Sequence, residues 1–99
     1  MARKKKYPTI PAHTKVTNKR TYETLYTDDF KDGNTMGEAR HEPPQIVIQK
    51  GHNERETFST YIHELCHAAD FEYNIKLTED QVLKLEKAIM HILKLNNWL

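Results

Sequence analysis

Residues 61–70 read Tyr-Ile-His-Glu-Leu-Cys-His-Ala-Ala-Asp and contain the pattern His-Glu-x-x-His between His63 and His67. They lie in a longer segment, from about Glu54 to Tyr73, whose apolar residues recur with the period of a helix. A spacing of four puts both imidazoles on one helix face, one turn apart, where one zinc ion could accept a nitrogen from each. The pattern therefore predicts a metal-binding helix.

Glu64 follows His63 directly, so it projects about 100° from His63 and about 60° from His67 around the helix. Its carboxylate would then lie beside the open position of the metal, where it could accept a proton from an activated water. We therefore predict Glu64 as the catalytic base. A structural alternative is that the two histidines only bridge helices through hydrogen bonds.

Capping signals delimit two helices. Asn53 with Glu56 three residues later predicts the start of the first helix. Thr78 with Gln81 predicts a second helix from Glu79 to about Leu95. The first helix has a broad apolar side, expected to face the core, formed by Phe58, Tyr61, Ile62, Leu65, Ala68 and Ala69.

A catalytic zinc site uses three protein ligands and leaves a position for water. In the second helix Glu86 falls within an apolar stripe, where a carboxylate is costly unless it is compensated. We therefore predict Glu86 as the third ligand; the alternative is that Glu86 snorkels or meets Lys50 or Arg55. The stripe consists of Val82, Leu85, Ile89, Ile92 and Leu93.

Asp70 lies on the same helix face as the two histidines and is the rival ligand. Neighbouring turns of one helix crowd a three-ligand site, which favours an acid that orients an imidazole N–H, or a plain surface acid. Cys66 points away from this face and is expected to be a small core residue.

The residues before the helices predict a small sheet. Residues 15–26 are rich in Thr, Tyr and Val and indicate one or two half-buried strands, and residues 28–37 carry turn signals. Residues 45–49 read as a short β-branched strand. Strands followed by helices predict an α+β fold, with a small, mainly antiparallel sheet packed on the two helices.

The chain has 99 residues, 37% hydrophobic and 29% charged, which predicts one domain. Residues 1–12 contain a basic cluster from Arg3 to Lys6 and two prolines, and are expected to form a basic flexible arm before a domain at 13–99. A net charge of +1 gives no reason to expect nucleic acid as the main partner, although the arm could touch phosphate. No stretch is long and apolar enough for a membrane span or signal peptide, and the single Cys66 fits a cytoplasmic location.

With the two histidines and the distal Glu86 in this order, residues 44–93 resemble the gluzincin branch of the zincin metallopeptidases. The likeness is to its very small bacterial and phage forms, of SprT-like, ImmA/IrrE-like or minigluzincin character. The resemblance implies a minimal zincin-like domain with one zinc held by His63, His67 and Glu86. It also implies that the strand before the motif helix lines the cleft and pairs with an extended substrate; its residues are Gln45, Ile46, Val47, Ile48 and Gln49. Candidates for steadying the oxyanion are His41, Tyr22 and Tyr26.

The expected function is that of a zinc-dependent peptidase acting on a peptide or protein substrate. Two alternatives remain open. One is a zinc-stabilised, weakly active or inactive binding protein, such as a phage accessory protein, because a chain this short has little material for a deep specificity pocket. The other is a DNA-associated protease, suggested by the SprT-like resemblance and the basic arm.

Overall fold

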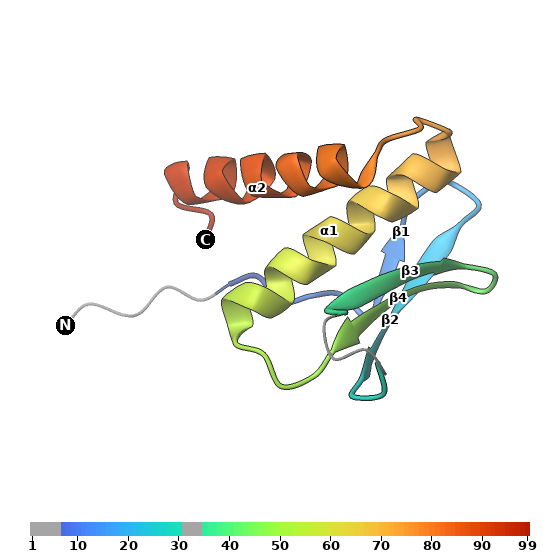
Figure 1. The fold of residues 1–99 in the computed structure, drawn as a ribbon, viewed down its shortest axis with the longest axis horizontal. Coiled ribbons are helices and arrows are strands. Elements are labelled where there is room, and N and C mark those ends of the chain that lie inside the picture. Colours follow the sequence, from blue (N-terminus) through green and yellow to red (C-terminus); the bar gives the residue numbers. More distant parts are fainter. Residues whose placement is uncertain (1–6, 31–34) are drawn as a thin grey trace.

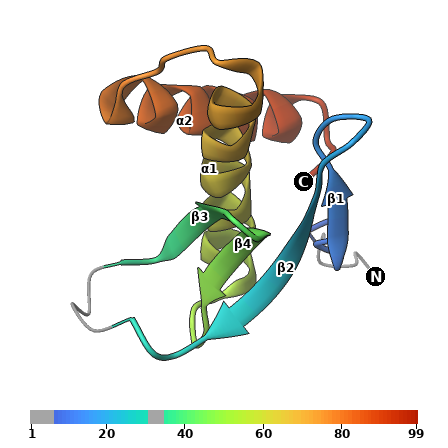
Figure 2. The same cartoon turned by 90° about the vertical axis from the view of Figure 1, so that its right-hand side faces the viewer.

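The computed structural model describes residues 7–30 and 35–99 of the chain. The elements in this part follow one another as β1 (His13–Lys15), β2 (Thr21–Thr27), β3 (Gly37–His41), β4 (Pro44–Gln49), α1 (Glu54–Tyr73) and α2 (Glu79–Leu95). Figures 1 and 2 show three layers, in which α1 lies between the sheet and α2. The predicted α+β fold is confirmed.

The strands form one mixed sheet in the order β1-β2-β4-β3. The β1–β2 and β3–β4 pairs are antiparallel, whereas β2 and β4 run parallel, with Leu25 opposite Val47. Turns were expected up to Gly37, but Gly37 begins β3; residues 31–34 of that segment lie outside the described residues. In this strand order β4 is an inner strand and β3 is an edge strand.

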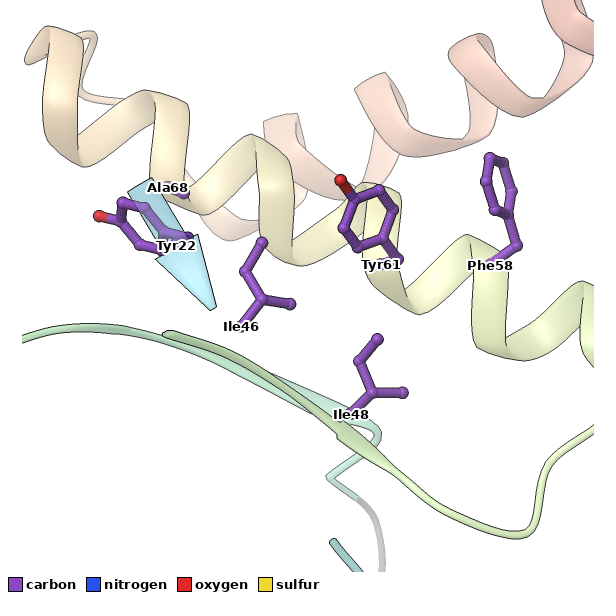
Figure 3. Close-up of a cluster of buried hydrophobic side chains, with 6 residues drawn as sticks. All are labelled: Tyr22, Ile46, Ile48, Phe58, Tyr61 and Ala68. Atoms are coloured by element: carbon purple, nitrogen blue, oxygen red, sulfur yellow. The ribbon is translucent and has the colours of Figure 1, made fainter. Parts of the chain in front are cut away.

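A cluster of buried side chains joins the sheet to α1. Ile46 and Ile48 of β4, together with Tyr22 of β2, pack against residues of α1, as Figure 3 shows. Burying each of the two isoleucines contributes about 1.5–3 kcal/mol to stability. The α1 members are Phe58, Tyr61 and Ala68. The predicted core side of this helix is thus confirmed, and Cys66 is also buried as expected.

Both helices begin at the predicted caps. The side-chain oxygen of Asn53 accepts a hydrogen bond from the backbone N–H of Glu56 at 2.8 Å. Thr78 and Gln81 form a reciprocal capping box, with bonds of 3.1 and 2.9 Å. These local interactions satisfy N–H groups that have no partner within the first helical turn, so they fix where each helix starts.

A short return loop joins the helices and lets α2 run back along α1 (Figure 1). Asn74 adopts a left-handed backbone conformation with φ of 54°, and its N–H donates to the carbonyl of Asp70. The carboxylate oxygen Oδ1 of Asp70 accepts hydrogen bonds from the N–H groups of Lys76 at 2.6 Å and Leu77 at 2.9 Å. Asp70 therefore holds the loop that delivers the start of α2.

The buried face of α2 differs in part from the predicted stripe. Val82 is buried, and Met90 and Leu93 pack against the core, as an apolar face requires. Leu85 and Ile92, however, are 42% and 51% exposed. The predicted stripe includes more residues than the buried face, because α2 packs only on α1 among the described helices and strands. This contact covers only part of the apolar side of α2.

Residues 7–12 belong to the folded domain, not to a flexible arm as predicted. Tyr7 and Ile10 pack against the core, and the rings of Tyr7 and Phe58 lie 6.0 Å apart. The backbone carbonyl of Pro11 accepts a hydrogen bond from the Thr24 hydroxyl at 2.8 Å. Two apolar side chains among the prolines were enough to anchor this segment; residues 1–6, with the basic cluster, lie outside the described residues.

Candidate metal centre

Two imidazoles and one carboxylate meet between α1 and α2. His63 and His67 lie one turn apart on α1, with ring centroids 5.0 Å from each other. Glu79, the first residue of α2, places one carboxylate oxygen 2.9 Å from Nε2 of His63 and the other 2.9 Å from Nε2 of His67. Donor atoms of these three residues all lie within 4.8 Å of one another.

This donor set fits zinc. Two neutral imidazole nitrogens and one carboxylate are a ligand combination found in catalytic zinc sites, and three protein ligands leave one position open. Ligands about 2.0–2.1 Å from a tetrahedral zinc are about 3.3 Å from each other. The two imidazole–carboxylate distances of 2.9 Å are a little shorter than this value, and the donor atoms all lie close enough together for one ion.

Glu86 is not part of this donor group, although it was the predicted third ligand. Its carboxylate is 14% exposed and lies 3.0 Å from Nδ1 of His63, the ring nitrogen that does not face Glu79. It also accepts a hydrogen bond from the hydroxyl of Ser59. Glu86 does lie on the inner face of α2, as predicted, but His63 and Ser59 compensate its buried carboxylate. Glu86 thereby orients the ring of His63.

Glu79 was missed because its position has a simpler explanation. An acidic residue in the first turn of a helix is favoured by the helix dipole and by the free N–H groups there. Glu79 was therefore not predicted as a metal ligand. The signal that could have found it is its place directly after a short loop, which brings α2 back to the motif helix.

Asp70 was expected to orient an imidazole N–H or to be a plain surface acid, and among the described residues its side-chain partners are instead in the loop after α1. Its side chain accepts hydrogen bonds from the two loop N–H groups of Lys76 and Leu77. Glu79 follows Leu77 by two residues. Asp70 therefore positions Glu79 by holding the loop that precedes it.

Glu64 is buried, with an exposed fraction of 6%, next to the metal-binding face. Burial raises the pKa of its carboxyl to about 7, and the negative charges of Glu79 and Glu38 act in the same direction. The charge of His63 and a hydrogen bond from the backbone N–H of Ala39 oppose this rise. A carboxyl with such a pKa can both accept and release a proton near neutral pH.

Gly37 lets β3 approach the motif helix closely. A Cβ at this position would lie 2.6 Å from Cγ2 of Thr60 and 3.0 Å from Cγ of Glu64. The absent side chain thus leaves room for β3 beside Glu64, and Ala39 two residues later donates to that carboxylate.

An open cleft of about 1250 Å³ runs along α1 between β3 and α2 and includes His63, Glu64 and His67 in its lining. The predicted substrate-pairing strand, Gln45 to Gln49, is β4, which has β2 on one side and β3 on the other. It therefore has no free edge for a substrate, and this expectation is corrected. The strand that lines the cleft is β3.

His41 at the end of β3 lines the cleft, and its ring stacks on Phe71 with centroids 3.8 Å apart. Its Nδ1 lies 2.9 Å from the Tyr22 hydroxyl, which donates its only proton to Glu72 at 2.7 Å. Proton counting therefore makes Nδ1 of His41 the donor to Tyr22. Burial lowers the pKa of His41, so the neutral ring keeps a lone pair on Nε2. Tyr22 itself is fully buried, and Tyr26 is 47% exposed outside the cleft lining.

No protein-family model, no curated protein and no solved structure matches this chain. Across residues 7–30 and 35–99, neither helix combines the length and apolar character needed to cross a membrane.

Proposed function

We propose that this chain is a zinc-dependent peptidase in which His63, His67 and Glu79 hold the metal and Glu64 is the catalytic base. The observation that carries the proposal is the buried carboxylate of Glu64 beside a His/His/Glu donor set, on the floor of an open cleft. Buried carboxylates with a raised pKa in a cleft are typical of acid–base catalysts.

A zinc ion held by His63, His67 and Glu79 would supply a Lewis acid for the substrate carbonyl and for a water. The carboxylate of Glu64 accepts a proton from this water as its oxygen bonds to the carbonyl carbon. When the C–N bond breaks, the protonated Glu64 gives that proton to the departing amine.

The edge strand β3 is the surface on which an extended substrate would lie. Its pairing with β4 uses one side only, and no strand among the described residues occupies the other. A peptide that adds to this edge gains backbone hydrogen bonds without depending on its sequence. It would lie over α1 with a carbonyl near the metal centre, because Ala39 of β3 contacts Glu64.

The proposal is tested by incubating zinc-loaded protein with unfolded casein and identifying fragments by mass spectrometry. We expect fragments from the native sequence and none from Glu64→Gln, whose amide keeps the shape but accepts no proton. The control is equal zinc content and equal melting temperature of the two proteins. If both bind zinc and neither cleaves casein, the chain is a zinc-stabilised binding protein and the proposed activity is wrong.

A further inference from the structure

The cleft continues beyond the metal centre along the first turns of α1 and the last turns of α2. This end, which we call the basic end, is lined by the cationic residues Arg55, Lys87 and Lys94, together with His91. No carboxylate of the described residues lies within ion-pair distance of the three cations. Their charges are therefore available to a ligand in the cleft.

Two acidic side chains line the cleft beside the basic end, and each has a partner other than the three cations. Glu56 lies 3.4 Å from a ring nitrogen of His52, and Glu86 holds Ser59 and His63. The other end of the cleft is lined by Asp70 and Glu79. The three cations therefore favour a substrate aligned with its negative charge at the basic end.

The direction of β3 sets that alignment. Gly37 lies against Thr60 near the middle of α1, and His41 stacks on Phe71 near its end, so β3 runs in the same sense as α1. Antiparallel pairing is more stable per residue than parallel pairing. A substrate strand antiparallel to β3 would run from His41 towards Gly37, so its C-terminal part would enter the basic end.

The spacing can be estimated from the helix. Arg55 precedes Glu64 by nine positions, which corresponds to about 13 Å along a helix axis. An extended peptide covers this distance in about four residues. Arg55 therefore lies beside about the fourth residue after the bond held at Glu64. Lys87 and Lys94 line the same end of the cleft, so acidic residues up to this position would meet the cations.

We propose that the substrates are peptide segments with Asp or Glu at about these positions on the C-terminal side of the cleaved bond, bound by Arg55, Lys87 and Lys94. The inference rests on the proposed function for the location of that bond. The attraction itself depends only on the folded cleft, so binding can be measured without turnover.

The binding test uses three fluorescein-labelled decapeptides built from Ala, Leu and Gly. The first carries three consecutive Glu in its C-terminal half, and the second carries three Gln at the same positions. The third carries the three Glu in its N-terminal half. Fluorescence anisotropy with zinc-loaded Glu64→Gln protein measures affinity without cleavage. We expect about fivefold tighter binding of the C-terminal Glu peptide than of the other two, because exposed ion pairs each contribute little. The ratio should fall at high salt.

Two variants assign the effect. Lys87→Gln combined with Lys94→Gln should bring the Glu-to-Gln ratio close to one, whereas Lys84→Gln should leave it unchanged. Lys84 is a matched control, since it lies on the same helix, pairs with Asp80 and does not line the cleft. Equal affinity for the Glu and Gln peptides, a preference for N-terminal Glu, or a ratio that survives the double substitution would overturn the inference. Such results would leave the casein assay, and with it the proposed activity, standing on its own.

Discussion

The carboxylate of Glu79 lies 2.9 Å from Nε2 of His67, although the two residues sit on different helices. The contact exists because a short loop returns the chain and starts α2 at the motif helix. This contact makes Glu79, and not Glu86, the carboxylate of the donor group. Glu86 lies instead beside Nδ1 of His63, the other ring nitrogen.

Substitutions of the two acids should separate their roles. Glu79→Gln removes an anionic donor and should weaken zinc binding more than Glu86→Gln. Loss of an acid that only orients a ligand typically costs about 10- to 100-fold in metal affinity. Competition with a chromophoric chelator gives both values. A larger loss for Glu86→Gln than for Glu79→Gln would restore Glu86 as the ligand.

Asp70→Ala should loosen the loop that positions Glu79. The substitution leaves the N–H groups of Lys76 and Leu77 without their acceptor, so we expect a loss of about 1–3 kcal/mol in the free energy of unfolding. Zinc affinity should fall as well, because Glu79 is then less ordered. Urea unfolding and chelator competition measure the two effects. Asp70→Asn is the control, since its side-chain oxygen still accepts; a loss as large as that of Asp70→Ala would argue against the loop role.

Gly37→Ala should push β3 away from the motif helix. The new Cβ would lie 2.6 Å from Cγ2 of Thr60, so we expect about 1–3 kcal/mol of destabilisation from overpacking. Thr60→Ser removes that methyl group and should recover part of the stability in the double variant. Thermal melts of the single and double variants check this, and no recovery would mean that the close approach is not the cause.

The stability of the zinc-free protein should depend on Glu72 at acid pH. The Tyr22 hydroxyl, followed by Arg20, holds the pKa of Glu72 below its ordinary value of 4.5, although burial opposes the shift. A carboxyl with a lowered folded-state pKa adds stability above its unfolded pKa, and this stability is lost as the pH falls through the folded-state pKa. Melting temperatures from pH 6 down to pH 3, values chosen to span the shift, should therefore drop more steeply for the native sequence than for Glu72→Gln. Parallel curves would show that the network around Glu72 does not contribute.

The helices were predictable because their signals are local. Asn53 and Thr78 sit at the caps that their side chains form, and the apolar period of α1 located its buried side. The edge strand β3 was not predictable in the same way, because Gly-Glu-Ala-Arg-His contains no β-branched residue and owes its extended form to pairing with β4.

The residues of the metal centre were predictable only where they lie on a single helix. The His63 to His67 spacing and the position of Glu64 follow from a single helix, whereas the third donor depends on how two helices meet. The partial burial of Glu86 was foreseen from the period of α2, but the period does not say which nitrogen of His63 a carboxylate reaches.

The most direct measurement of the central claim is a crystal structure of zinc-loaded protein with diffraction data collected on both sides of the zinc absorption edge. The account predicts one anomalous peak bonded to Nε2 of His63, Nε2 of His67 and the carboxylate of Glu79, with Glu64 beside it and Glu86 still on Nδ1 of His63. A peak bonded to Glu86 in place of Glu79, or no peak between the two histidines at saturating zinc, would contradict it.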